Sequence, residues 1–226
     1  QQEAVRKLGF YTQRTMRTAQ QLYEGINLGS GPVGLITYMR TDSVTLAADA
    51  IAEIRQVIEQ RYGAEQVPET PRVFKTKSKN AQEAHEAIRP TSVGYTPEQV
   101  KAHLSSDQAR LYELIWKRAM ASQMAPAKVD MVAVEFDCDR DAAFRANGSV
   151  IAFPGYLKVY EESRPVGKEE KEVRLPDLKE GDVVKVEKIR AEQHFTEPPP
   201  RYTEASLVKA LEDFGIGRPS TYASII

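Results

Sequence analysis

The stretch Gly34-Leu35-Ile36-Thr37-Tyr38-Met39-Arg40-Thr41-Asp42-Ser43 decides how the first half of the chain is interpreted. Residues 33–38 are apolar and partly β-branched, which predicts a short buried strand. A long helix is predicted next, over 47–62, with Asp42 and Ser43 as natural caps. A strand that leads into a helix start brings a phenol, a guanidinium and free backbone N–H groups together. Because helix N-termini favour phosphate, we expect an anion site here.

Tyr38 and Arg40 are the candidate reactive pair of this site. A phenol is a weak nucleophile at neutral pH, but a neighbouring guanidinium favours its phenolate form and can also hold a phosphate under attack. The simpler alternative stays open on these residues alone. In it, Tyr38 packs at the strand end, Arg40 is solvated, and Asp42 or Ser43 only caps the helix.

Two further segments carry candidate phosphate-binding residues. A short helix predicted around 81–87 would put His85 and Arg89 on one face, because they are four residues apart. A basic run precedes it, at Arg72, Lys75, Lys77 and Lys79. Farther along, Arg218 and Ser220 follow two glycines, and Ser220 is predicted to cap another helix. A solvated histidine and a plain turn before a capped helix are the alternatives.

The order of elements predicts an α+β fold. Early helices include one with Met16, Ala19, Tyr23 and Ile26 on its buried face. A capping box at Thr96 begins one later helix, and Ser105-Ser106-Asp107-Gln108 opens another. The predicted strands are 128–136, 142–146, 150–153, 157–160 and 183–189, and a helix resumes over 203–214. We expect a helical domain over 1–124 that bears Tyr38, a β-rich antiparallel domain over 125–200 and a short helical return segment over 201–226.

Composition excludes several classes. The chain is 41% apolar and 28% charged, with 31 basic and 32 acidic residues, so polyanion binding requires a local patch. No apolar run approaches the roughly 20 residues of a membrane span. The single cysteine, Cys138, cannot form an internal disulfide. No metal-ligand motif stands out, and we expect no metal site. The first and last residues lack start and stop signals, so we expect a piece of a longer protein.

Four blocks of sequence together resemble the type IA DNA topoisomerase family, in its bacterial topoisomerase I branch. They lie in the family's order and spacing across the chain. Thr37-Tyr38-Met39-Arg40 favours this branch over topoisomerase III, which usually has a proline between the tyrosine and the arginine. The blocks are Gly34–Ser43, Gln82–Pro90, Arg201–Lys209 and Gly215–Ala223.

The resemblance implies a role for each candidate residue. Tyr38 would attack one DNA strand and become linked to its 5′ phosphate, leaving a free 3′ hydroxyl. Arg40 would hold the scissile phosphate, and His85 would assist by phosphate contact or a hydrogen-bond relay. Asp42, and Arg218 with Ser220 and Thr221, would position the strand. Passage of a second strand and religation would relax negative supercoils without ATP.

The resemblance also implies what lies outside this chain. Family members bind Mg²⁺ through a glutamate and an acidic triplet of an N-terminal Toprim domain, and they add C-terminal zinc-ribbon regions. Neither is present here. We therefore expect no cofactor in the chain itself and no relaxation activity from it alone. Its expected partners are single-stranded DNA and the remaining domains of the same enzyme, in the bacterial cytoplasm at the nucleoid and not at a membrane.

Two other functions are weighed against this one. Tyrosine recombinases and type IB topoisomerases also use Tyr, His and Arg, but their tyrosine lies C-terminal to the other two, whereas Tyr38 precedes His85 and Arg89. The second is a non-catalytic module that binds single-stranded DNA and uses Tyr38 to stack on a base.

Overall fold

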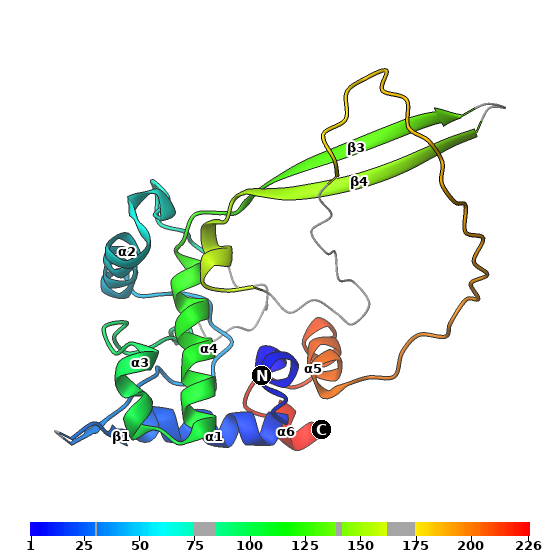
Figure 1. Ribbon diagram of the computed structural model, residues 1–226. Coiled ribbons are helices and arrows are strands. Elements are labelled where there is room, and N and C mark those ends of the chain that lie inside the picture. Colours follow the sequence, from blue (N-terminus) through cyan, green and yellow to red (C-terminus); the bar gives the residue numbers. More distant parts are fainter. Residues whose placement is uncertain (30, 75–84, 139–141, 162–174) are drawn as a thin grey trace. The chain divides into compact units, whose positions relative to one another are not determined.

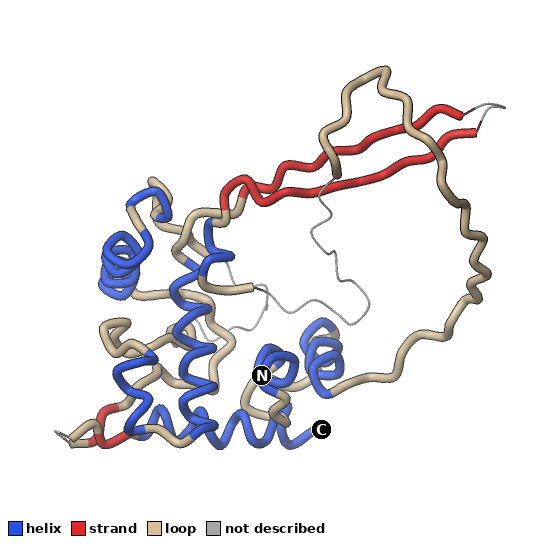
Figure 2. The backbone as a smooth tube through the Cα atoms, in the orientation of Figure 1, coloured by secondary structure: helices blue, strands red, loops and turns tan. Residues whose placement is uncertain are grey.

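The computed structural model describes residues 1–29, 31–74, 85–138, 142–161 and 175–226. The chain divides into two compact units, and each is described by itself. One is a helical unit, built from 1–126, 154–163 and 202–226, and the other is a hairpin unit, built from 127–153 and 164–201. Helices and small antiparallel sheets are both present, so the predicted mixture of α and β is confirmed (Figures 1 and 2). The three-domain division stays a prediction.

The helical unit contains six α-helices among its described residues. They are α1 (Thr12–Glu24), α2 (Ala48–Tyr62), α3 (Pro97–Val100), α4 (Ser106–Ser122), α5 (Glu204–Asp213) and α6 (Tyr222–Ile225). A π-helical turn, η1 (Ala4–Leu8), precedes them, and short 3₁₀ turns are η2 (Ala64–Gln66), η3 (Lys101–His103) and η4 (Gly155–Lys158). A small hairpin pairs β1 (Ile26–Asn27) with β2 (Pro32–Val33).

Helix α4 carries much of the core. It begins as predicted after Ser105, and the structure shows a capping box there, in which Ser105 and Gln108 exchange side-chain and backbone hydrogen bonds. The predicted capping box of Thr96 and Gln99 starts α3 in the same way. Two large aromatic residues of α4 are buried and keep their polar atoms paired. The Tyr112 hydroxyl donates to the Tyr95 carbonyl at 2.6 Å, and the Trp116 indole N–H donates to the Val93 carbonyl at 3.1 Å. Burial raises the pKa of Tyr112 far above its usual range.

The segment that leads to Tyr38 is extended and fixed on both sides. The backbone N–H of Leu35 donates to the Leu22 carbonyl at 2.8 Å, near the end of α1. On the other side, the N–H of Thr37 donates to Arg89, and that of Thr91 donates back to Leu35. Leu35, Ile36 and Met39 are fully buried. The predicted strand is thus extended and buried, although only its first residue belongs to β2 and Ile36 forms a single bridge with Pro90.

The predicted caps of the second helix are wrong. Helix α2 begins at Ala48, and its N-cap residue, Ala47, provides no side-chain cap. Instead, the Ala47 N–H donates to a carboxylate oxygen of Glu86 at 2.8 Å. Thr41 and Ser43 accept bonds from backbone N–H groups two residues ahead, which favours a turn over a helix. The free N–H groups of a helix start therefore do not follow Tyr38 directly.

Two other helix predictions also need correction. Residues 81–84 of the predicted helix lie outside the described part of the chain, as do Lys75, Lys77 and Lys79, but 85–90 is not helical. His85 and Arg89 therefore do not share a helix face. In α1, the buried side chains include Thr15, Ala19 and Leu22, whereas Tyr23 is exposed. Buried threonines are tolerated because their hydroxyls donate to carbonyls one turn earlier.

The hairpin unit is simpler than predicted. Strand β3 (Lys128–Cys138) pairs antiparallel with β4 (Ala142–Phe153), which joins two predicted strands into one. Residues 183–189 form no strand in the described part of this unit. Of the predicted strand 157–160, the first two residues belong to the 3₁₀ turn η4 of the helical unit and the last two follow it. That turn follows Gly155, which has a φ of 49° and packs so tightly on Ala125 and Pro126 that a Cβ would not fit. No described helix is long and apolar enough to cross a membrane.

Candidate active site

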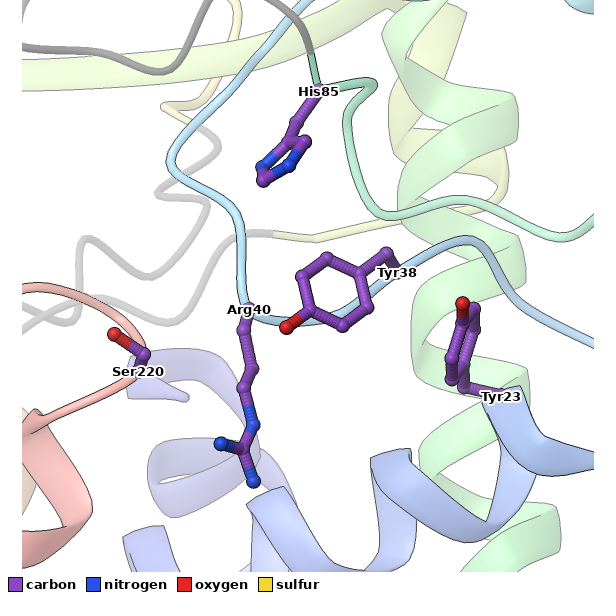
Figure 3. A pocket seen from close by; sticks show the side chains of 5 residues that line it. All are labelled: Tyr23, Tyr38, Arg40, His85 and Ser220. Carbon is purple, nitrogen blue, oxygen red and sulfur yellow. The ribbon is translucent and has the colours of Figure 1, made fainter.

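A pocket of about 620 Å³ opens beside Tyr38 in the helical unit. Four parts of the chain meet there: the end of α1, the extended segment after it, the residues around 85 and the loop before α6 (Figure 3). The lining residues are Tyr23, Tyr38, Arg40, His85 and Ser220. The structure therefore brings four of the predicted site residues together and adds Tyr23.

Tyr38 stands at the centre of this pocket with 39% of its surface exposed. Its ring meets Tyr23 at 5.4 Å between centroids, with 66° between the ring planes. It meets His85 at 5.6 Å and 73°. Both are edge-to-face contacts, the arrangement that aromatic pairs prefer. Figure 3 shows the Tyr38 hydroxyl pointing away from Tyr23 and toward the backbone of Arg40. A hydroxyl in this position is open to a ligand.

Arg40 supplies the positive charge of the pocket. Its side chain is exposed, and within the described part of the chain its guanidinium makes no hydrogen bond or ion pair. In the view of Figure 3 the side chain extends away from the Tyr38 hydroxyl. The guanidinium is thus free to take an anion that lies between the two side chains, since a guanidinium can bind phosphate through two parallel N–H bonds.

The imidazole ring of His85 makes an edge-to-face contact with the ring of Tyr38. The side chain is half-buried, and its Nδ1 atom is buried and has no hydrogen-bond partner in the part of the chain that the structure describes. A buried polar atom without a partner costs free energy, which is common where a ligand or water completes the site. This atom can accept or donate a proton once a ligand is bound.

Arg89 lies differently from the sequence-based expectation. Its guanidinium pairs with both carboxylate oxygens of Glu86, at 2.7 and 3.0 Å, and its Nη1 donates to the carbonyls of Pro90 and Thr91. Only 12% of the side chain is exposed. Every nitrogen of the guanidinium is therefore engaged in holding the segment that carries His85.

The loop before α6 is a compact turn. The Thr221 hydroxyl accepts from the Arg218 N–H at 2.9 Å and donates to the Arg218 carbonyl at 3.1 Å. Thr221, not Ser220, is the N-terminal cap residue of α6, so the predicted cap is wrong and Ser220 lies exposed in the pocket instead. Burial, Glu212 and Asp42 together raise the pKa of Tyr222, which places Asp42 on this side of the site.

This loop is held against α1 by the preceding helix. The carboxylate of Glu204, at the start of α5, accepts hydrogen bonds from the backbone N–H and the hydroxyl of Thr12, at 2.8 and 2.9 Å. Gln1 donates to the Pro219 carbonyl at 2.7 Å. Ala205, Val208 and Tyr222 are buried. Residues 202–226 thus dock on the unit that holds Tyr38, and this docking sets the position of Ser220.

The profile of a family described as "DNA topoisomerase" matches residues 1–226, the whole chain. The chain belongs to the type IA DNA topoisomerase family. It is 58% identical over 234 residues to DNA topoisomerase 1 of Xylella fastidiosa (strain 9a5c) and 56% identical over 227 residues to that of Rickettsia felis. A structure titled as full-length topoisomerase I from Thermotoga maritima superimposes with a TM-score of 0.80 at 43% identity. The resemblance stated from the four blocks is confirmed.

The coverage of these topoisomerases is partial. All of this chain is matched, but it spans 28% of the Xylella relative, 29% of the Rickettsia relative and 35% of the Thermotoga chain, while 99% of it is covered by the last. Type IA topoisomerases generally depend on Mg²⁺. Among the described residues, no group of three or more His, Cys, Asp or Glu side chains converges. The described residues therefore do not fit a complete Mg²⁺ site.

Proposed function

We propose that this chain supplies the nucleophile of a type IA topoisomerase, Tyr38. Its phenolic oxygen attacks a phosphodiester of one DNA strand. A bond forms between that oxygen and the 5′ phosphate, the bond to the 3′ oxygen breaks, and the phenolic proton ends on the departing 3′ hydroxyl. The reverse reaction religates the strand. The observation that carries this proposal is the half-exposed Tyr38 in one pocket with a histidine and with a guanidinium that has no partner among the described residues.

Arg40 and His85 have complementary roles in this proposal. Arg40 holds the scissile phosphate and stabilises the negative charge that develops during transfer. Its lack of any partner among the described residues supports this role. His85 assists by contact with the phosphate or by relaying the proton. This role is supported by its buried Nδ1, which finds no partner among the residues that are described. Because both transesterifications conserve the phosphoester bond, no ATP is needed.

The remaining predicted residues position the strand. Ser220 offers a hydroxyl in the pocket, and Thr221 and Arg218 shape the turn that presents it. Asp42 lies on the same side and would orient basic groups of this loop. For Arg89, the bonds to Glu86 support a role in positioning the His85 segment, and direct phosphate contact would require the guanidinium to exchange those bonds.

The whole reaction requires parts beyond this chain. We propose that the Mg²⁺ ligands lie in other regions of the complete enzyme, since the chain spans about 28% of its curated relatives. Residues 1–124, 125–200 and 201–226 would then be the tyrosine-bearing domain, a β-rich hinge domain and the start of a return segment. The complete enzyme would relax negative supercoils by strand passage at the bacterial nucleoid, and the partner of this chain would be single-stranded DNA.

The test uses the intact enzyme with Tyr38→Phe, supercoiled plasmid and Mg²⁺. Phenylalanine keeps the ring and removes the nucleophile, so relaxation and covalent complex should both be lost. Retained relaxation would favour the alternative of a binding module in which Tyr38 stacks on a base. With single-stranded oligonucleotides labelled at either end, the label at the 3′ end should stay with the protein. Retention of the 5′ label would instead indicate recombinase-type chemistry.

A second test uses the 226-residue chain alone. Incubated with plasmid and Mg²⁺, it should leave the plasmid supercoiled, and it should retain weak binding of a single-stranded oligonucleotide. Robust relaxation would show that the chain holds the complete active site.

A further inference from the structure

We propose that Tyr23 is a positioning residue that holds the ring of Tyr38 in the orientation needed for attack. The inference rests on the proposed role of Tyr38 as the nucleophile. Tyr23 lies in the last turn of α1 and is the aromatic residue of this helix. It lines the same pocket as Tyr38, Arg40 and His85.

The ring contact is the first observation. Tyr23 lies 5.4 Å from Tyr38 between centroids, in an edge-to-face arrangement, and His85 makes a second edge contact at 5.6 Å. The Tyr38 ring is therefore flanked by two aromatic rings, although 39% of the residue is exposed. An exposed tyrosine without such neighbours samples several χ1 rotamers. The contacts restrict this freedom while the hydroxyl end stays open.

The backbone links the same two residues. The Leu35 N–H donates to the Leu22 carbonyl at 2.8 Å, which ties the segment before Tyr38 to the last turn of α1. Gly34 approaches so closely that a Cβ there would lie 2.7 Å from the Tyr23 carbonyl oxygen. Only glycine permits this approach without a shift. Tyr23 and Tyr38 thus belong to one rigid local arrangement and do not meet by chance at the surface.

The ring of Tyr23, and not its hydroxyl, makes this contact. Figure 3 shows the hydroxyls of Tyr23 and Tyr38 pointing in different directions. Within the described part of the chain the Tyr23 hydroxyl makes no hydrogen bond. Since attack on phosphorus depends on the position of the phenolic oxygen, loss of a flanking ring should slow the chemical step and leave DNA binding unchanged.

The experiment measures single-turnover cleavage and DNA affinity separately, in the intact enzyme. Tyr23→Leu removes the ring and Tyr23→Phe keeps it. Tyr11→Leu is the matched control, because Tyr11 is a 68% exposed tyrosine at the other end of α1. The substrate is a single-stranded oligonucleotide labelled at its 3′ end. The rate of covalent complex formation is measured at saturating enzyme, and the Kd is measured by anisotropy.

We expect Tyr23→Leu to lower the cleavage rate about 2- to 10-fold, the factor that corresponds to an aromatic pair. Tyr23→Phe and Tyr11→Leu should stay within about twofold of the parent, and the Kd should change by less than about twofold throughout. Gly34→Ala perturbs the same contact from the backbone and should give the same pattern. If Tyr23→Leu does not fold, this variant decides the question.

Three results would overturn the proposal: a Tyr23→Leu rate equal to that of the parent, a Tyr23→Phe rate as low as that of Tyr23→Leu, or a loss confined to the Kd. The last would mean that Tyr23 contacts DNA directly. A readout independent of activity is the ¹⁹F resonance of 3-fluorotyrosine placed at position 38, which should shift in Tyr23→Leu and not in Tyr11→Leu. Failure of the proposed function is distinguishable, because it would appear as covalent complex formed by Tyr38→Phe.

Discussion

The hydrogen bonds between Glu204 and Thr12 hold residues 202–226 on the helical unit, and their removal should be measurable. Thr12 is buried, with 2% of its surface exposed, and it is the first residue of α1. The cap residue of α1, Tyr11, provides no side-chain acceptor. Glu204, which lies 192 residues away, therefore serves as the cap of this helix.

The magnitude follows from the two bonds. Glu204→Ala leaves the Thr12 N–H and hydroxyl without their acceptor, and an unsatisfied buried donor costs about 1–3 kcal/mol. Glu204 is only half-buried, so water can replace part of the loss. We expect the free energy of unfolding to fall by about 2–3 kcal/mol. Glu204→Gln keeps an acceptor oxygen without the charge and should lose about 1 kcal/mol.

Trp116 provides the assay, because it is the only tryptophan of the chain and is buried in the helical unit. Urea unfolding followed by its fluorescence reports this unit, and a double-mutant cycle with Thr12→Val isolates the bond to the hydroxyl. We expect a coupling energy of about 1 kcal/mol. A loss below about 0.5 kcal/mol for Glu204→Ala would refute the capping role, and additive effects in the cycle would refute the bond to the hydroxyl.

Three further predictions follow from the site and its surroundings. Arg89→Ala should lower the free energy of unfolding by about 2 kcal/mol, because it breaks a largely buried ion pair. Arg40→Ala should change the free energy of unfolding by less than about 0.5 kcal/mol. The same urea titration measures both variants, and equal effects would contradict the assigned roles. Gly34→Ala should cost about 1–3 kcal/mol, since its Cβ meets the Tyr23 carbonyl oxygen, and an unchanged midpoint would show that the backbone can shift freely. Burial raises the pKa of Tyr160 to about 12, above the value of 10 in the unfolded chain, and the carboxylate of Glu3, which accepts a hydrogen bond from the Tyr160 hydroxyl, adds to this shift. The contribution of the Tyr160 hydroxyl to the free energy of unfolding is therefore complete below pH 10 and is lost as the pH rises toward 12. In that range the parent should lose its greater stability relative to Tyr160→Phe. A difference in the free energy of unfolding that stays constant with pH would contradict this.

Local sequence signals identified the helices well and the loops poorly. The capping boxes at Thr96 and Ser105 use contacts within four residues, so the sequence alone defines them. The start of α2 could not be found in this way. The N–H group of its N-cap residue, Ala47, donates to Glu86, which lies 39 positions away, whereas the better local candidates, Asp42 and Ser43, lie in a turn. Long-range capping leaves no local pattern.

The candidate site shows the same division. Tyr38, Arg40 and His85 were recognisable as reactive residue types, and the structure places them at one pocket with Ser220. Tyr23 was assigned to the core, because its spacing from Ala19 matches a helix face. Ala19 is indeed buried, but the buried face continues through Thr15, Thr18 and Leu22 and leaves Tyr23 exposed. The hydroxyls of Thr15 and Thr18 donate to backbone carbonyls one turn earlier, so hydropathy alone does not reveal that these residues are buried.

Arg89 shows why residue type and proximity do not suffice to assign a role. The sequence predicts both Arg40 and Arg89 as candidate phosphate-binding residues, since a guanidinium is chemically able to bind phosphate. The two arginines differ in their hydrogen-bond partners. Each guanidinium nitrogen of Arg89 has a partner, whereas the guanidinium of Arg40 has no partner among the described residues. A guanidinium that must first abandon a carboxylate binds an anion at a cost, whereas an unpaired one binds without it. We therefore propose that Arg40 supplies the catalytic charge of this pocket, and that the bonds of Arg89 fix the segment from which His85 reaches Tyr38.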